Sequence, residues 1–209
     1  MERYLSHLTA LEFKCNVTLH DALKAVQLVD MVQRLSDEIS SYVAQLGYEG
    51  RFIKMQLEEM AGGVAEQQLL LVKDYCHRNE KSAEQVAAHI RQCSMEELKQ
   101  VVVLSRVFGH GGSLSSLEAR VSPRGYRILA GLPRIPMQVI ENVVGTFDSL
   151  QKVLDATVDE LDDVDGIGEV RAKVIKEGLR KAQEQVVMEQ GESYKVGEEE
   201  FAQGNDIEK

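Results

Sequence analysis

The stretch Val164-Asp165-Gly166-Ile167-Gly168-Glu169-Val170-Arg171-Ala172-Lys173 decides the fold of the C-terminal part of this sequence. Just before it, Thr157 and Glu160 have the spacing of a capping box, which predicts a short helix that ends ahead of the glycines. Gly166 and Gly168 allow turn conformations that a β-carbon would penalise. A second helix is expected to begin near Gly168. The pattern is therefore typical of two helices joined by a tight turn, a helix-hairpin-helix.

The start of this second helix is expected to bind an anion. Amides at a helix start have no acceptor within the helix, and glycines leave them uncovered. Lysines and arginines follow on the same helix, so a phosphate of a nucleic-acid backbone is the expected ligand. The predicted contacts are Gly166, Ile167, Gly168, Arg171, Lys173 and Lys176.

An alternative interpretation of the glycines is a compact corner between two helices that binds nothing. The neighbouring apolar residues favour the binding hairpin, because their spacing lets the two helices pack together and leaves most cations outside. The residues expected to pack in this way are Leu161, Val164, Ile167, Val170, Val174 and Ile175.

A second, weaker hairpin pattern lies upstream. Ser122-Pro123 predicts a helix start that continues to about Gly131, and a further helix is expected over residues 137–147. In the turn between them, Arg134 and Pro136 stand where the later hairpin has glycines, and proline offers no amide to a phosphate. This copy is expected to be mainly structural, or else to contact phosphate through Arg134, Arg124 or Arg127.

The sequence divides into three parts. A helical spine is expected over residues 1–112, a tandem helix-hairpin-helix domain over 113–188, and an acidic, disordered tail over 189–209. Within the second part, a short helix over residues 149–155 links the hairpins into a five-helix unit that would lie across a minor groove. A net charge of −10 is unusual for a protein that binds DNA. The tail holds seven acidic and two basic residues, so half of that negative charge lies outside the predicted DNA-binding domain.

The spine is expected to be built from long helices. Thr18 is expected to cap a helix that ends at Leu46, with Gly47 after it. A second helix should run over residues 50–77, with a kink or break at Gly62-Gly63. Helices over 82–92 and 94–108 follow, and the glycines of residues 109–113 are expected to form a flexible hinge.

Composition predicts an all-α protein without a membrane span. There are only three prolines, no strand-like alternation, and no apolar run near the ~18 residues that would cross a bilayer. The cysteines have no metal-ligand spacing and indicate reduced thiols of a cytoplasmic protein. The five histidines are scattered, and no nucleophile has an identifiable base, so neither an active site, a metal nor a cofactor is expected in this chain.

Several motifs together resemble the bacterial DNA integrity scanning (DisA) family over nearly the whole chain except the tail. They are Thr9-Ala10-Leu11-Glu12-Phe13, Glu49-Gly50-Arg51-Phe52-Ile53-Lys54, Ser122-Pro123-Arg124-Gly125-Tyr126-Arg127-Ile128-Leu129, Leu132-Pro133-Arg134-Ile135-Pro136, Ile140-Glu141-Asn142-Val143-Val144 and the opening stretch. The resemblance implies a helical spine followed by hairpins similar to those of the junction-binding RuvA.

The same family implies a diadenylate cyclase domain that makes cyclic di-AMP from ATP with Mg²⁺ or Mn²⁺. Its Asp-Gly-Ala and Arg-His-Arg signatures are absent from this sequence. The expected function is therefore sequence-independent binding of branched or junction DNA, as the sensing and linker part of a damage-scanning protein. The expected partners are the DNA backbone and a cyclase domain or other subunits. The alternative is a helical scaffold for protein assembly with structural hairpins; a nucleotide-forming enzyme is the third hypothesis.

Overall fold

The computed structural model describes residues 1–77 and 82–204, with side chains described as far as residue 188. All the regular elements in these ranges are helices, which confirms the all-α class. They are α1 (Glu2–Phe13), α2 (Leu19–Gln45), α3 (Arg51–Ala61), α4 (Val64–Tyr75), α5 (Ala83–Gln92), α6 (Met95–Lys99), α7 (Val101–Val107), α8 (Leu114–Leu117), α9 (Tyr126–Ala130), α10 (Met137–Phe147), α11 (Leu150–Asp155), α12 (Val158–Asp162) and α13 (Glu169–Gly204).

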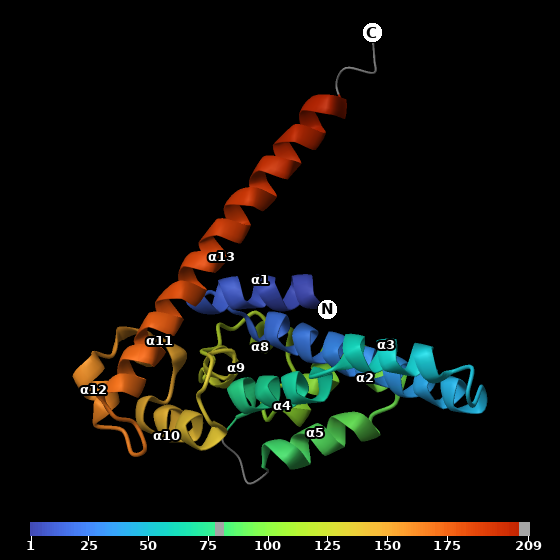
Figure 1. The fold of residues 1–209 in the computed structure, drawn as a ribbon, viewed down its shortest axis with the longest axis horizontal. Helices are drawn as coiled ribbons and strands as arrows, with labels where there is room; N and C mark the ends of the chain where they lie inside the picture. The colour runs from blue at the N-terminus through green and yellow to red at the C-terminus, as the bar shows by residue number, and fades with distance from the viewer. Residues whose placement is uncertain (78–81, 205–209) are drawn as a thin grey trace.

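Helices α2 to α8, together with Leu8 of α1, form the N-terminal part of the molecule around one apolar core (Figure 1). The helix α2 begins where the sequence predicts, because Thr18 caps it and its N3 residue Asp21 bonds back to the Thr18 amide at 3.0 Å. The predicted break between α3 and α4 is confirmed at Gly62-Gly63, where Gly63 has a φ of +80°. The helix predicted over 94–108 is divided at Gln100 into α6 and α7.

The glycine segment 109–113 is held to the N-terminal part by hydrogen bonds, which differs from the predicted flexible hinge. The His110 ring nitrogen Nε2 lies 2.9 Å from the Tyr75 carbonyl, and the Ser105 hydroxyl donates to the Gly111 carbonyl at 2.7 Å. A β-carbon on Gly112 would collide with the guanidinium group of Arg106. The glycines therefore permit close packing here.

Helices α9 to α13 form the second part, with its own apolar core. Two residues of α1, Ala10 and Phe13, are buried in that same core, so a helix early in the chain completes the hairpin unit. Figure 1 shows α1 lying beside α13. The predicted bounds of α10 and α11 are confirmed, and Ser149 caps α11.

Two predictions for this part are wrong in detail. The helix α9 begins at Tyr126 instead of Pro123, because its amides are capped by a carboxylate from α4, described below. In α13, Val170 and Val174 are 80% and 41% exposed, so they do not pack the hairpin as expected. Ile175 of the same helix is buried as predicted, and Ala172 and Leu179 are buried with it.

A buried polar network joins the two parts. The Asp74 carboxylate accepts hydrogen bonds from the amides of Gly125 and Tyr126, both at 2.7 Å, and from the Arg127 amide at 3.0 Å. The Arg127 guanidinium pairs with the Glu12 carboxylate, which also accepts from the Tyr75 hydroxyl at 2.5 Å. Charged groups from α1, α4 and α9 thus meet in the interior and fix the hairpins against the linker.

The helix α13 continues as one element to Gly204 and projects away from the body of the molecule (Figure 1). Disorder is predicted from residue 189, whereas the backbone is helical as far as Gly204. Residues 189–204 contain five Glu and two Gln, which are good helix formers, against three Gly, which are poor ones. Residues 205–209, the end of the predicted tail, lie outside the described residues.

Candidate nucleic-acid interface

The turn between α12 and α13 has the backbone that the sequence predicts. The capping box of α12 is formed by Thr157 and Glu160, with the Glu160 amide donating to the Thr157 hydroxyl at 3.2 Å. Gly166 has a φ of +78°, a left-handed conformation that favours glycine. The Ile167 side chain is buried in the hairpin core, and its amide donates to the Val164 carbonyl at 2.9 Å. Ile167 thus anchors the turn and is not exposed for a ligand.

The start of α13 presents uncovered amides. The first hydrogen bond of this helix joins the Ala172 amide to the Gly168 carbonyl at 3.0 Å. The amides of Glu169, Val170 and Arg171 therefore have no acceptor within the helix, as at any helix start. A β-carbon added at Gly168 would meet nothing within 4 Å. The backbone at Gly168 consequently has open space beside it, which an anion could occupy.

Two side chains hold this turn in place. The Asn142 side-chain amide, from α10, donates to the Asp165 carbonyl at 2.8 Å. The Arg171 guanidinium donates to the Gly166 carbonyl on the other side of the turn. The Asn142 contact links the turn of the second hairpin to α10, the second helix of the first hairpin. It was not predicted, because no local sequence pattern indicates a contact between residues so far apart in the chain.

The two predicted lysines of α13 differ in their surroundings. Lys173 is exposed and pairs with Glu169 one turn earlier at 2.5 Å. That hydrogen bond lowers the pKa of Glu169 and raises the pKa of Lys173, but an exposed pair of this kind contributes little and can exchange for a phosphate. Lys176 is partly buried, and its ammonium donates to the Leu154 and Ala156 carbonyls at the end of α11. Lys176 is therefore a helix-capping residue in this structure.

The first hairpin has a turn of the same shape without glycine. Arg134 takes the place of Gly166 and has a φ of +65°, an uncommon conformation for a residue with a β-carbon. Its side chain is exposed, and among the described residues it has no hydrogen-bond or ion-pair partner. The tip of the first turn thus carries an arginine side chain that has no partner among the described residues.

The other two arginines predicted for the first hairpin point into the protein. The Arg124 guanidinium donates to the Lys73 carbonyl at 2.9 Å and to the Cys76 carbonyl at 2.6 Å, so it caps the end of α4. Arg127 is buried in its pair with Glu12. Both residues are structural here, in line with the mainly structural role expected of this hairpin, and the alternative expectation that they contact phosphate does not fit their internal partners.

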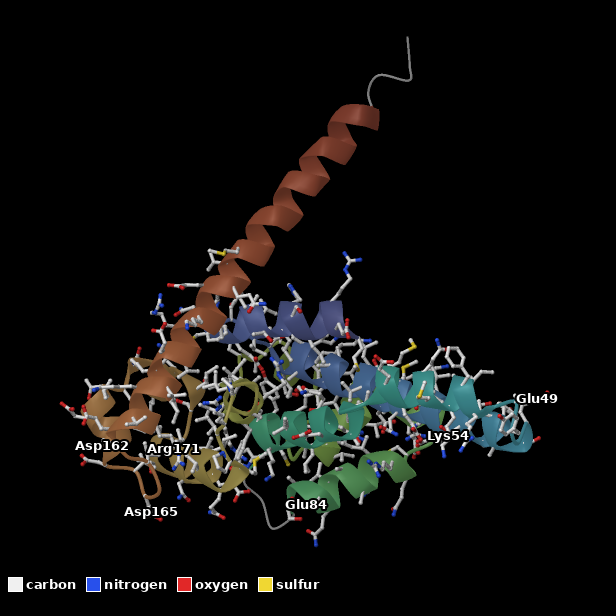
Figure 2. The ribbon with its side chains drawn as sticks, in the orientation of Figure 1. Glu49, Lys54, Glu84, Asp162, Asp165 and Arg171 are labelled. Atoms are coloured by element: carbon white, nitrogen blue, oxygen red, sulfur yellow. The ribbon has the colours of Figure 1, made fainter. Side chains whose placement is uncertain are left out.

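Carboxylates restrict the direction from which a polyanion could approach the second turn. Asp162, Asp163 and Asp165 are all exposed, and Figure 2 shows Asp162 and Asp165 at the same end of the molecule as Arg171. Because these acids repel phosphate, a polyanion is expected on the side of α13 that carries Lys173, where Pro133 of the first turn lines the same hollow. The resulting candidate interface consists of Gly166, Gly168, Arg171, Lys173 and Arg134.

Two further kinds of feature are absent from the described residues. Within them, no group of three or more His, Cys, Asp or Glu side chains is placed to hold a metal ion. In the same residues, no helix combines the length and the apolar character needed to cross a membrane.

Comparison with known families matches both parts of the chain. Residues 1–117 match the family described as the DisA bacterial checkpoint controller linker region. Residues 149–178 match the helix-hairpin-helix motif, which covers the turn with Gly166 and Gly168. The two models thus describe the linker and the second hairpin.

Curated relatives extend the similarity across most of the chain. The DNA integrity scanning protein DisA of Carboxydothermus hydrogenoformans is 49% identical over 186 residues, which cover 88% of this chain and 53% of the relative. The proteins of the same name from Clostridium botulinum and Clostridium acetobutylicum are each 43% identical and cover 90% of this chain. This chain spans about half the length of the curated relatives it matches.

Proposed function

This chain belongs to the DisA family, and from that premise we propose that it binds the backbone of DNA without reading base sequence. It would act as the linker and sensing part of a DisA-like DNA integrity scanning protein. The observation that carries the proposal is the turn before α13, which lies within the region that matches the helix-hairpin-helix motif. In this turn Gly166 has a left-handed backbone conformation, and there is open space beside the backbone of Gly168.

In this proposal one phosphate lies at the uncovered amides of α13. The Arg171 side chain holds the turn and adds positive charge, and Lys173 leaves Glu169 to pair with the same strand. Arg134, on the first hairpin, contacts the opposite strand. We further propose a preference for branched DNA over linear duplex, because a junction presents several minor-groove faces to the protein at fixed angles.

The remaining properties of the family belong to this proposal as well. Synthesis of cyclic di-AMP, with its ATP and its Mg²⁺ or Mn²⁺, would require a diadenylate cyclase domain, and neither of the two matched regions describes one. We therefore propose that this chain has no enzymatic activity by itself, needs no cofactor, and works in the cytoplasm beside a cyclase domain or other subunits.

Fluorescence anisotropy with a labelled four-way junction and a matched linear duplex tests the proposal. If Arg134, Arg171 and Lys173 each neutralise one phosphate, the logarithm of affinity should fall with the logarithm of salt concentration with a slope of roughly −3. A slope near zero would contradict backbone binding. Equal affinity for the junction and the duplex would remove the preference for branched DNA but leave the backbone contact standing.

A pair of glycine variants separates the site from the fold. In Gly168→Val the new side chain fills open space beside the uncovered amides, so binding should be lost while the helical circular dichroism signal survives. Gly145→Val, on α10, is the matched control, because a β-carbon there also meets nothing within 4 Å. Gly145→Val should bind as the wild type does. Full binding by Gly168→Val would exclude this turn as the site.

The scaffold alternative is favoured by one separate observation, the exposed apolar side chains on the second half of α2 and on α3, such as Tyr42, Phe52 and Met60. That surface lies away from the hairpins and can coexist with DNA binding.

A further inference from the structure

Two exposed valines of α13 form an apolar track that begins at the hairpin turn. Val170 is 80% exposed, and Val174, one turn later, is 41% exposed. Residues four positions apart share one face of a helix, so the two side chains lie one above the other beside the uncovered amides of α13. This face of α13 is therefore apolar at the point where the proposed phosphate would bind.

The track leads to a hollow between α13 and the turn of the first hairpin. The hollow is open and has a volume of about 600 Å³, within the range of roughly 300–1,000 Å³ that small-ligand sites occupy. Its apolar lining includes Leu132, Pro133, Val174 and Ala182. The first hairpin and α13 thus enclose a space that an apolar group of a ligand could fill.

Close packing of the two hairpins builds this hollow. A β-carbon on Gly178 of α13 would lie 2.8 Å from a methyl carbon of Leu132, so the leucine would have to shift if this residue were larger. Leu132 is 8% exposed and belongs to the core of the hairpin unit. One wall of the hollow is therefore held by the core, and Gly178 lets α13 approach it.

The charges that line the hollow suit a strand of nucleic acid. Lys173 and Lys181 both line it, and their side chains are 62% and 69% exposed. Glu177 is the one carboxylate among its lining residues, all of which the structure describes, and it is paired with Arg180 at 2.7 Å and with Lys181 at 3.5 Å. Such exposed pairs contribute little and can exchange for a phosphate. A nucleotide joins a flat apolar base to a phosphate, and the hollow offers a partner to each.

The length of α13 separates the hollow from the phosphate proposed at the hairpin turn. A helix rises about 1.5 Å per residue, so Val174 lies about 9 Å and Lys181 about 20 Å beyond Gly168. A phosphate at Gly168 is out of reach of Lys181, whereas a strand that continues along the apolar track would pass Val174 and then meet Lys181. A base inside a duplex is stacked and paired, so only an unpaired strand could place a base in the hollow.

Given the backbone binding proposed above, on which this step rests, we propose that the hollow takes one base of an unpaired strand next to the bound duplex. The strand leaves the phosphate at the start of α13, passes over Val170 and places a base against Pro133 and Val174. Lys181 contacts the phosphate of that nucleotide. The preferred DNA is then a duplex that carries a single-stranded tail, as at a fork, over one whose strands are paired to the end.

Fluorescence anisotropy of the whole chain with three forms of one labelled duplex tests this assignment. The first form is blunt, the second has a short single-stranded tail on either strand in turn, and the third has the same tail with abasic sites in place of its bases. One of the two tails should raise affinity roughly tenfold over the blunt form, because the hollow gains a base. The abasic tail keeps the phosphates but has no base to bury, so it should lose most of that gain.

Two valine substitutions on α13 separate the hollow from the turn. Val174→Glu puts a carboxylate into the hollow, so the ratio of tailed to blunt affinity should fall to about one. Val187→Glu is the matched control, because Val187 is 63% exposed on the same helix and is not among the residues that line the hollow, and it should keep the full ratio. Circular dichroism checks that both variants are folded.

The salt dependence of binding tests the contact of Lys181. Lys181→Gln should reduce the slope of log affinity against log salt by roughly 0.7 for the tailed duplex, since one contact to a single strand is lost. The slope for the blunt duplex should not change, because Lys181 lies beyond the proposed duplex contacts.

The blunt duplex distinguishes failure at the hollow from failure of the proposed function. Salt-sensitive binding of the blunt duplex with no gain from a tail on either strand would overturn the base site and leave backbone binding standing. A gain that persists with the abasic tail, or in Val174→Glu, would overturn the base site in the same way. No binding of any of these DNAs would overturn both.

Discussion

The buried carboxyl group of Glu12 should make the free energy of unfolding fall as the pH rises. Burial raises the pKa of Glu12 to about 7, against the opposing pull of the Arg127 charge. The perturbation that reports on it is Glu12→Gln, which keeps the size and the hydrogen-bonding atoms of the side chain but cannot titrate.

The sign and size of the effect follow from linkage. A carboxyl whose pKa is raised by folding is held in its protonated form by the native state, so its contribution is fully present below the unfolded pKa and is lost as pH rises through the folded one. The pKa moves from an ordinary value of 4.5 to about 7. Because a tenfold change in a proton-binding constant corresponds to about 1.4 kcal/mol, the wild type should lose about 3 kcal/mol of unfolding free energy between pH 4.5 and pH 8, relative to Glu12→Gln.

Urea unfolding at several pH values, followed by circular dichroism, measures this difference. Between pH 4.5 and pH 7 the unfolding free energy of the wild type should fall relative to that of Glu12→Gln, so the two curves against pH should diverge. Glu2→Gln is the matched control, because Glu2 is an exposed carboxylate on the same helix, and its curve should follow that of the wild type. Parallel curves for the wild type and Glu12→Gln would refute the argument from burial.

Two further substitutions separate stability from binding. Asp74→Ala leaves three amides at the start of α9 without their acceptor, so urea unfolding should show a loss of about 3 kcal/mol; a loss below about 1 kcal/mol would mean that water or a rearranged helix replaces the cap. Arg134→Gly relieves a left-handed residue and should raise the unfolding free energy by about 1 kcal/mol. The same variant should reduce the salt slope of junction binding by about 1, and an unchanged slope would remove Arg134 from the interface.

The helices were predictable wherever their signals are local. The caps expected at Thr18 and Thr157 are both formed, and the structure also has capping boxes that begin at Ser82 and Ser94. Such caps involve residues three positions apart, so the sequence contains both partners. The start of α9 was mispredicted because its cap is Asp74, which lies far away in the chain and reaches the helix only after folding.

The candidate site also has a part that local sequence predicts and a part that depends on the fold. Gly166 and Gly168 were predictable, since the conformation of a turn is a property of its own residues. The roles of the cations were less predictable, because an arginine or lysine can pair with a phosphate or with any carbonyl that the fold brings near. For Arg124, Arg127 and Lys176 the fold supplies internal partners, and for Arg134 it supplies none among the described residues.

The burial of Ala10 and Phe13 in the hairpin core has a consequence for how the chain acquires its structure. The ribosome delivers α1 well before α13, yet the two helices complete one core. Leu8 of α1 is buried in the core of the linker, so α1 can pack there first, whereas Ala10 and Phe13 stay uncovered until α13 has emerged and the hairpin unit closes. Since contacts between distant segments form slowly, docking of α13 against α1 should be the late step of folding. Newly made chains would bind DNA only once synthesis has passed the last buried turn of α13.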